Sequence, residues 1–175
     1  MQIILHFTSG VNAYIQTFKH LDIQLPKRCP CCGGTKLYKW GKYYRFLVDE
    51  EREHCIPIQR FRCAKCCKSG SCLPDFCLSN IQYSTNFVMK LLEYILLYGK
   101  VYQQELRTRI RFFKRRFFQN MNAFISFLRE LGSIRLPNTP KEKAIKVFGR
   151  LSSLHREKRL LTSFFHQTSK HFMAK

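Results

Sequence analysis

Four cysteines in two closely spaced pairs are the residues of this sequence best suited to chemistry. Cys29 and Cys32 form one CxxC and are followed by two glycines, and Cys63 and Cys66 form a second CxxC about thirty residues later. Each CxxC turn presents two sulfurs to one ion, and Zn²⁺ favours four such ligands in a tetrahedron. Glycine after the second cysteine lets the backbone turn beneath the ion. The spacing therefore predicts one Zn²⁺ site with these four cysteines as ligands.

Five further cysteines leave alternatives to this ligand set open. Cys31 or Cys67 can replace a neighbouring ligand, since each adjoins one in the sequence. Free thiols or an oxidised pair are the alternatives to metal binding. Cys55, Cys72 and Cys77 are expected to be small buried residues rather than ligands of a second ion. The first residues do not resemble a secretory leader, which favours metal binding in a reducing cytoplasm over the disulfides of a secreted protein.

A cluster of basic residues between positions 107 and 120 is the second group able to do chemistry. Arginine commonly reads guanine edges, and lysine and arginine hold backbone phosphates. The cluster therefore predicts a helix that contacts nucleic acid, and the alternative is a charged helix face that only meets solvent. The candidate contact residues are Arg107, Arg109, Arg111, Lys114, Arg115, Arg116, Gln119 and Asn120.

Residues for catalysis are not evident in this chain. It has 11 Asp and Glu in all, and none of them forms a set with the pattern of a divalent-metal nuclease. A glycine-rich phosphate loop and a Ser/His/Asp arrangement are also missing. We therefore expect a binding protein and not an enzyme.

The predicted metal ligands need β-structure to bring them together. Strand-like segments at 36–40, 43–48 and 56–61 separate the two CxxC pairs and suit a hairpin that carries one pair to the other. A short strand near 3–7 and a helix near 12–20 are expected before them. The expected zinc ribbon spans 27–78, after an N-terminal strand-helix segment at 1–26.

The basic cluster needs helices, and the apolar spacing after residue 83 supplies them. It predicts a helix-turn-helix-like domain at 83–135, with helices near 85–98, 101–108 and 112–131. Gly99 and Gly132 are plausible helix stops. A basic segment at 141–175, helical in places, follows a Pro-rich linker. The expected fold class is thus α+β. In the third helix one apolar stripe is expected to be buried: Phe113, Phe117, Phe124, Phe127, Leu128 and Leu131.

The charge distribution favours a polyanionic partner. The formal net charge is +20, and it is spread over three regions, 27–72, 100–135 and 141–175, each with a net charge of +7. Binding to phosphates releases condensed counterions, so such a chain is suited to nucleic acid. An anionic membrane surface is the competing partner for the last region. No apolar run is long enough to predict a membrane span.

Aromatic residues alternate with basic ones in two places, and stacking on exposed bases is one use for them. Phe112, Phe113, Phe117 and Phe118 are nevertheless expected in the core, because they recur at helical spacing. The ribbon aromatics Trp40, Tyr43 and Tyr44 are expected to be partly exposed.

The ribbon motifs resemble those of the N-terminal DNA-binding region of bacterial insertion-sequence transposases. The resemblance rests on the two CxxC pairs, on Gly41 and Arg45, and on the segments 60–66 and 73–76, and it extends over roughly residues 27–135. It implies a zinc ribbon with Cys29, Cys32, Cys63 and Cys66 as ligands, joined to a helix-turn-helix, without the catalytic domain. Many of these helix-turn-helix motifs carry a glycine in the turn before the last helix. The expected turn of this chain, 109–112, has no glycine.

Three functions follow as hypotheses. The first is a DNA-binding protein of the bacterial cytoplasm, nucleoid-associated and linked to transposition as an accessory, regulatory or truncated protein. Its expected partner is double-stranded DNA. The second is an RNA-binding or ribosome-associated zinc protein, which shares the charge and the ribbon. The third is an interaction module that recruits a protein of the transposition machinery.

Overall fold

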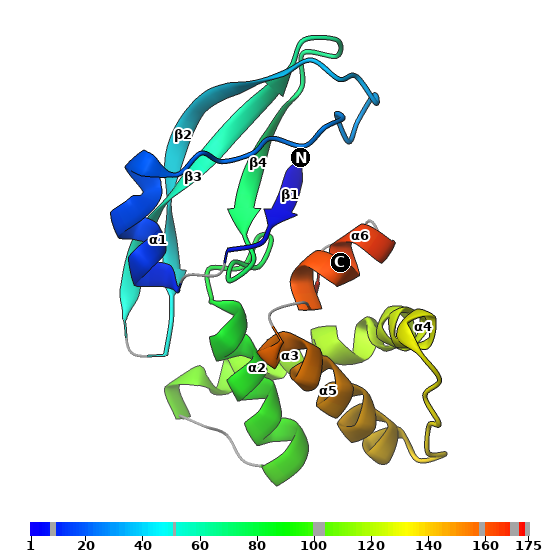
Figure 1. Cartoon of the computed structure of the whole chain (residues 1–175). Coiled ribbons are helices and arrows are strands. Elements are labelled where there is room, and N and C mark those ends of the chain that lie inside the picture. Colours follow the sequence, from blue (N-terminus) through cyan, green and yellow to red (C-terminus); the bar gives the residue numbers. More distant parts are fainter. Residues whose placement is uncertain (8–9, 51, 100–103, 158–159, 169–171, 174–175) are drawn as a thin grey trace. The chain divides into compact units, whose positions relative to one another are not determined.

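The chain divides into two compact units, named the first unit (Met1–Ser84) and the second unit (Thr85–Lys175). The segment 1–26 and the expected ribbon both belong to the first unit, and 141–175 belongs to the second together with the preceding helices. Figure 1 shows the computed structural model of the chain. It describes residues 1–7, 10–50, 52–99, 104–157, 160–168 and 172–173.

The first unit is built on a four-stranded sheet with the strand order β1-β4-β3-β2 (Figure 1). β3 is antiparallel to both β2 and β4, whereas β1 runs parallel to β4. The expected strands overlap with β1, β2 and β3, so the predicted hairpin is confirmed. The strand bounds are Gln2–Leu5 for β1, Leu37–Val48 for β2, Glu53–Cys63 for β3 and Ser69–Pro74 for β4.

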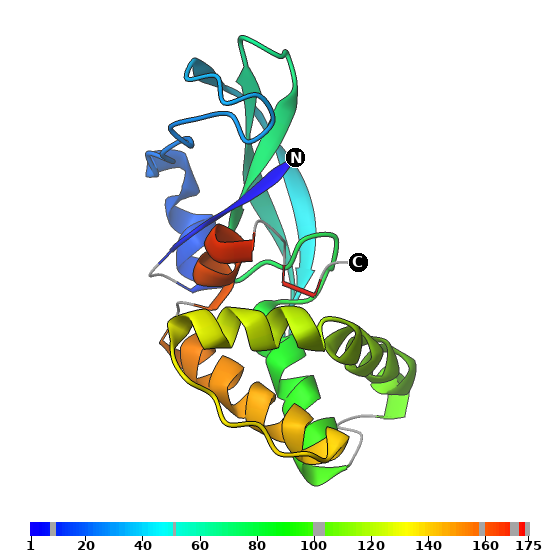
Figure 2. The same cartoon turned by 90° about the vertical axis from the view of Figure 1, so that its right-hand side faces the viewer.

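One short helix covers part of this sheet. α1 (Val11–Thr17) continues into a 3₁₀ turn (Phe18–His20), which confirms the helix expected near 12–20. Both views show α1 beside the sheet (Figures 1 and 2). The Tyr14 hydroxyl donates a hydrogen bond to the Pro57 carbonyl at 2.8 Å, and the Tyr14 ring is 1% exposed. Burying this aromatic anchor while satisfying its hydroxyl fixes the helix on the hairpin.

The sequence does not predict β4, because its Ser-Gly-Ser start has the composition of a turn. Gly70 lies within the strand because a larger residue would collide with a neighbouring ring. It pairs with Phe61 of β3, and a Cβ atom at position 70 would lie 2.4 Å from the Phe61 ring. The absent side chain thus leaves room for the aromatic ring, which is fully buried.

A bulge in β2 changes which of its side chains lie on each face of the sheet. The register with β3 shifts between Lys39 and Lys42, and Gly41 takes the left-handed φ of +67° within the shift. An extra residue in one strand reverses the alternation of its side chains. Tyr38 and Tyr44 would share a face in a regular strand, and the bulge places them on opposite faces.

The segment between β4 and α2, residues 75–84, packs against one face of the sheet. Arg45 of β2 donates from Nη2 to the carbonyl oxygens of Leu78, at 2.7 Å, and Ile81. Cys72 and Cys77 are buried as expected, and burial raises the pKa of each thiol to about 12. The same expectation is wrong for Cys55, which is exposed on the uncovered part of β3.

The described part of the second unit is helical. α2 packs on α3, and α4 contacts both α5 and α6 (Figure 2). A π-helical turn at Tyr94–Tyr98 continues α2 to Gly99, whose φ of +65° ends it, so the helix predicted at 85–98 is confirmed. A 3₁₀ turn at Gln104–Leu106 leads into α3, and the start of the helix expected at 101–108 lies outside the described residues. The turn expected at 109–112 is wrong, because these residues lie within the continuous helix α3. The helix bounds are Thr85–Glu93 for α2, Arg107–Gln119 for α3, Met121–Leu131 for α4, Pro140–Arg156 for α5 and Leu160–Thr168 for α6.

The prediction of a single helix over 112–131 is wrong. The chain turns at Asn120, which ends α3 and precedes α4. Phe117 and Phe124 consequently stack with ring centroids 5.4 Å apart, whereas seven residues of straight helix would separate them by about 10 Å along the axis. Both rings are fully buried, so the turn is stabilised by aromatic packing. Leu131, expected in the same buried stripe, is 46% exposed.

The C-terminal helices complete this core. α5 begins with Thr139 as its N-cap residue, whose hydroxyl accepts from the Glu142 backbone N–H and donates to the Glu142 carboxylate. Phe148 of α5 contacts Phe117, and Phe164 of α6 contacts Phe124. The expected basic tail is therefore integral to the second unit. Among the described residues, no helix combines the length and the apolar character that crossing a membrane requires.

Candidate functional site

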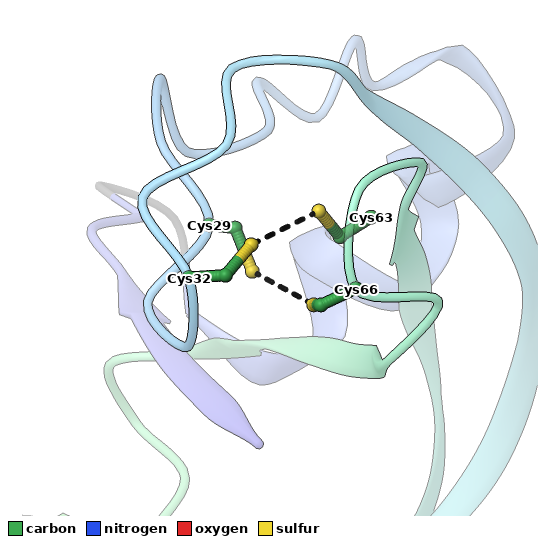
Figure 3. A group of neighbouring side chains, drawn as sticks. All are labelled: Cys29, Cys32, Cys63 and Cys66. Carbon is green, nitrogen blue, oxygen red and sulfur yellow. Dashed lines mark hydrogen bonds between the residues drawn. The ribbon is translucent and has the colours of Figure 1, made fainter.

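The four cysteines of the two CxxC pairs converge at one end of the β2–β3 hairpin. Cys29 and Cys32 precede β2, while Cys63 ends β3 and Cys66 lies in the turn to β4 (Figure 3). All four sulfur atoms lie within 4.8 Å of one another. The Sγ atoms of Cys29 and Cys66 are 3.7 Å apart, and those of Cys32 and Cys63 are 3.6 Å apart. This group can hold a metal ion.

The sulfur spacing fits a tetrahedral metal site and not a disulfide. Sulfurs bound to one zinc ion at about 2.3 Å stand about 3.8 Å apart, close to the two distances observed. A disulfide needs about 2.05 Å. Cys31 and Cys67 are exposed and lie outside the cluster, although each adjoins a member of it.

The two turns that carry these sulfurs have the same backbone design. In the first, the Cys29 N–H donates to the Gly34 carbonyl at 2.7 Å and the Gly33 N–H donates to the Cys29 carbonyl at 2.9 Å. In the second, the Cys63 N–H donates to the Lys68 carbonyl and the Cys67 N–H donates to the Cys63 carbonyl, both at 3.0 Å. The residue after the second ligand has a left-handed φ in both turns, +70° at Gly33 and +56° at Cys67. The turns are therefore equivalent, but the second lacks the glycine.

The environment already favours ionisation of two of the thiols. Burial disfavours the Cys29 thiolate, but hydrogen bonds from backbone N–H groups of Cys31 and Cys32 and from nearby thiols outweigh it and lower its pKa to about 7. The backbone N–H of Cys66 makes the largest contribution to lowering the pKa of Cys63.

Cys66 behaves in the opposite way. The backbone N–H of Lys68 favours its thiolate, but burial and the three neighbouring thiols together raise its pKa to about 12. The four sulfurs therefore do not all ionise together without a cation. A divalent cation supplies the charge that allows a complete thiolate set.

Substitution at the left-handed positions tests the equivalence of the two turns. We expect Cys67→Gly to stabilise the first unit by roughly 0.5–1 kcal/mol, since relief of the left-handed strain exceeds the extra freedom of glycine in the unfolded chain. Gly33→Ala is expected to destabilise it by a similar amount. Urea unfolding followed by the fluorescence of Trp40, the single tryptophan, measures both. Metal content should be unchanged in Cys67→Gly, and loss of the metal would identify Cys67 as a ligand.

The basic cluster of the sequence forms one side of α3. Its buried side is made by Ile110, Phe113 and Phe117. Arg107, Arg111 and Lys114 are among the exposed residues, and the 13-residue helix contains no acidic residue. The exposed candidates are Arg107, Arg109, Arg111, Lys114, Arg115 and Gln119.

Two of the candidate contact residues are engaged within the helix. The Arg116 guanidinium is half-buried and lies 5.3 Å from the centroid of the Phe112 ring. Asn120 is also half-buried, and its Nδ2 donates to the Arg116 carbonyl at 2.9 Å. Asn120 therefore caps the C-terminal end of α3. The sequence does not predict this role, because it places Asn120 within a single helix over 112–131.

Residues 29–111 match the protein family described as Domain of unknown function (DUF6431). The matched region begins at the first cysteine of the cluster and ends within α3. It therefore includes the candidate metal centre and the first turn of the basic helix. No curated protein and no solved structure matches the chain significantly.

Proposed function

We propose that this chain is a zinc-stabilised nucleic-acid-binding protein and that α3 is its contact with double-stranded DNA. Zinc is the metal that we assign to the cluster, because tetrahedral sets of four cysteine sulfurs are typical of structural zinc sites. In this role the ion joins two distant turns of a small unit and contributes folding free energy. Cys29, Cys32, Cys63 and Cys66 would hold it.

The basic side of α3 carries the proposal. Arg107, Arg111 and Arg115 follow one another at four-residue intervals and thus line one side of the helix. Like charges at this spacing repel one another and destabilise an isolated helix, by about 0.2–0.5 kcal/mol per pair. A phosphate backbone removes that repulsion and gains counterion release. The second unit as a whole holds 19 Lys and Arg against five Asp and Glu, which favours the same partner.

A link to transposition is the more specific part of the proposal. It is supported by the sequence resemblance to the DNA-binding region of insertion-sequence transposases, which includes the two CxxC pairs. We propose an accessory, regulatory or truncated protein of such a system, acting by binding rather than by cutting DNA. Preference for one duplex sequence over others in a selection experiment would support this role, and equal affinity for all sequences would contradict it.

The double substitution Arg111→Ala and Arg115→Ala tests the assignment of α3. We expect the affinity for a duplex to fall by roughly ten-fold, and the slope of log affinity against log salt to decrease by about two. Fluorescence anisotropy of a labelled duplex at several salt concentrations measures both. Both side chains are exposed, so the circular dichroism of the helices should be unchanged.

A matched control separates α3 from general electrostatic attraction. Lys146 and Arg150 are exposed on α5, have the same four-residue spacing and contribute the same charge. Replacing both with alanine should reduce the affinity by much less. Equal losses from the two double variants would show that α3 is not the contact helix.

A further inference from the structure

The strand β2 displays two exposed aromatic rings beside the cysteine cluster. Tyr38 is 40% exposed and Trp40 is 44% exposed, and their rings meet edge to face with centroids 5.8 Å apart. Tyr38 is the register partner of Arg62, which immediately precedes the cluster residue Cys63. The rings thus lie at the cluster end of the hairpin.

Arg62 connects these rings to the cluster. Its guanidinium carbon lies 4.8 Å from the centroid of the Trp40 ring. Its Nε donates at 3.1 Å to the carbonyl of Cys67, in the turn that also carries Cys66. The guanidinium is therefore held between the indole and the turn of the cluster, and its remaining N–H groups are available as phosphate donors. Tyr38, Trp40 and Arg62 are named the aromatic platform.

The backbone of β2 leaves this platform accessible. The bulge at Gly41 places Tyr38 and Trp40 on the face opposite to Tyr44 and Phe46, and bulges commonly re-aim a side chain in this way. β2 is also the last strand in the order of the sheet (Figure 1). Among the described strands none covers its outer side.

The charge around the platform selects a polyanion as its occupant. Residues 27–48 and 54–74 together contain ten Lys and Arg and no Asp or Glu. Even a zinc ion with four thiolates, which carries a net charge of −2, leaves this part of the unit strongly basic. Exposed aromatic rings within a basic surface are the arrangement that stacks unpaired bases while holding their phosphates.

We infer that the aromatic platform binds an unpaired stretch of nucleic acid, with bases stacking on Trp40 and Tyr38 and with Arg62 donating to a phosphate. This inference rests on the proposed function and adds a second contact to it, since a base within a duplex presents no free face for stacking. The chain then has two separate contacts, α3 for paired DNA and the aromatic platform of the first unit for an unpaired strand.

Trp40 is the single tryptophan of the chain, so its fluorescence reports directly on the platform. We expect a twelve-nucleotide oligo-dT or oligo-U to quench this fluorescence, and the tighter binder of the two identifies the unpaired strand as DNA or RNA. In anisotropy measurements Trp40→Leu should weaken binding of the better oligonucleotide at least about five-fold, and Trp40→Phe should recover part of the loss. Phe46→Leu is the matched control, because Phe46 is 63% exposed on the opposite face of the same strand.

A duplex probe separates the two ideas. If Trp40→Leu retains its metal and binds the duplex like the unsubstituted chain but loses affinity for the oligonucleotide, the inference is supported. If the duplex binds and Trp40→Leu leaves oligonucleotide binding unchanged, the inference alone is overturned. If neither probe binds the unsubstituted chain, the proposed function fails with it. A dimer in sedimentation that Trp40→Leu dissociates would instead make the platform an interface between copies and would overturn the inference.

Discussion

Replacing Cys63 with serine is expected to reduce the metal content from a single ion per chain to none and to unfold the first unit. Cys63 is fully buried, and its sulfur faces that of Cys32 at 3.6 Å. A serine hydroxyl does not ionise near neutral pH and is a poor ligand, so only three thiolates would remain. Because the unit is small and its core limited, metal binding and folding should be lost together.

Two optical signals make this result specific. Emission from Trp40 should shift to the red as the first unit opens, and the helical circular dichroism, which comes mainly from the second unit, should be retained. Cys31→Ser is the control, since Cys31 is exposed in the same turn and lies outside the cluster. A folded Cys63→Ser protein with its full metal content would refute the ligand assignment.

The substitution Phe117→Ala has the largest expected effect on the second unit. Phe117 is fully buried and contacts Phe124 at 5.4 Å and Phe148 at 6.2 Å between ring centroids. It therefore joins α3 to α4 and α5. Removing a buried phenyl ring leaves a cavity and costs about 3–5 kcal/mol. That is a large part of the total stability of a domain, which is about 5–15 kcal/mol.

The neighbouring residue supplies the control for this substitution. Phe118 is 40% exposed, so Phe118→Ala should change the free energy of unfolding by no more than about 1 kcal/mol. Urea unfolding followed by circular dichroism measures both variants. The metal content and the Trp40 emission should stay constant in each. Equal destabilisation by the two variants would contradict the assignment of Phe117 to the core of the second unit.

Several elements of the fold were predictable because their signals are local. The hairpin strands and the helix at 85–98 follow from apolar spacing and from a glycine stop at Gly99. The helix-turn-helix expected over 83–135 stays a prediction, and the turn expected at 109–112 lies within α3. The break at Asn120 was not predictable in the same way. The spacing of Phe113, Phe117 and Phe124 in the sequence is that of one continuous helix. Only the packing of Phe117 on Phe124 and Phe148 favours a turn at Asn120.

β4 and the aromatic platform depend on contacts between distant residues. Gly70 takes part in a strand because the Phe61 ring of another strand fills the space of its missing side chain. In the sequence Arg62 stands out only as part of the 60–66 motif, and its contact with Trp40 follows from strand register. The alternation of Tyr38 and Trp40 opposite Arg60 and Arg62 was the available signal, but the bulge decides which aromatic residues share their face.

The sequence by itself determined which residue types stand at metal-ligand spacing and how much positive charge the chain carries, because spacing within a CxxC turn and charge are properties of neighbouring residues. Only the tertiary structure decided between the predicted set, Cys29, Cys32, Cys63 and Cys66, and the alternatives with Cys31 or Cys67, both of which it leaves at the surface. It also decided which side of α3 is exposed. These outcomes depend on how distant segments pack, and the free energy of that packing is not encoded in any local pattern.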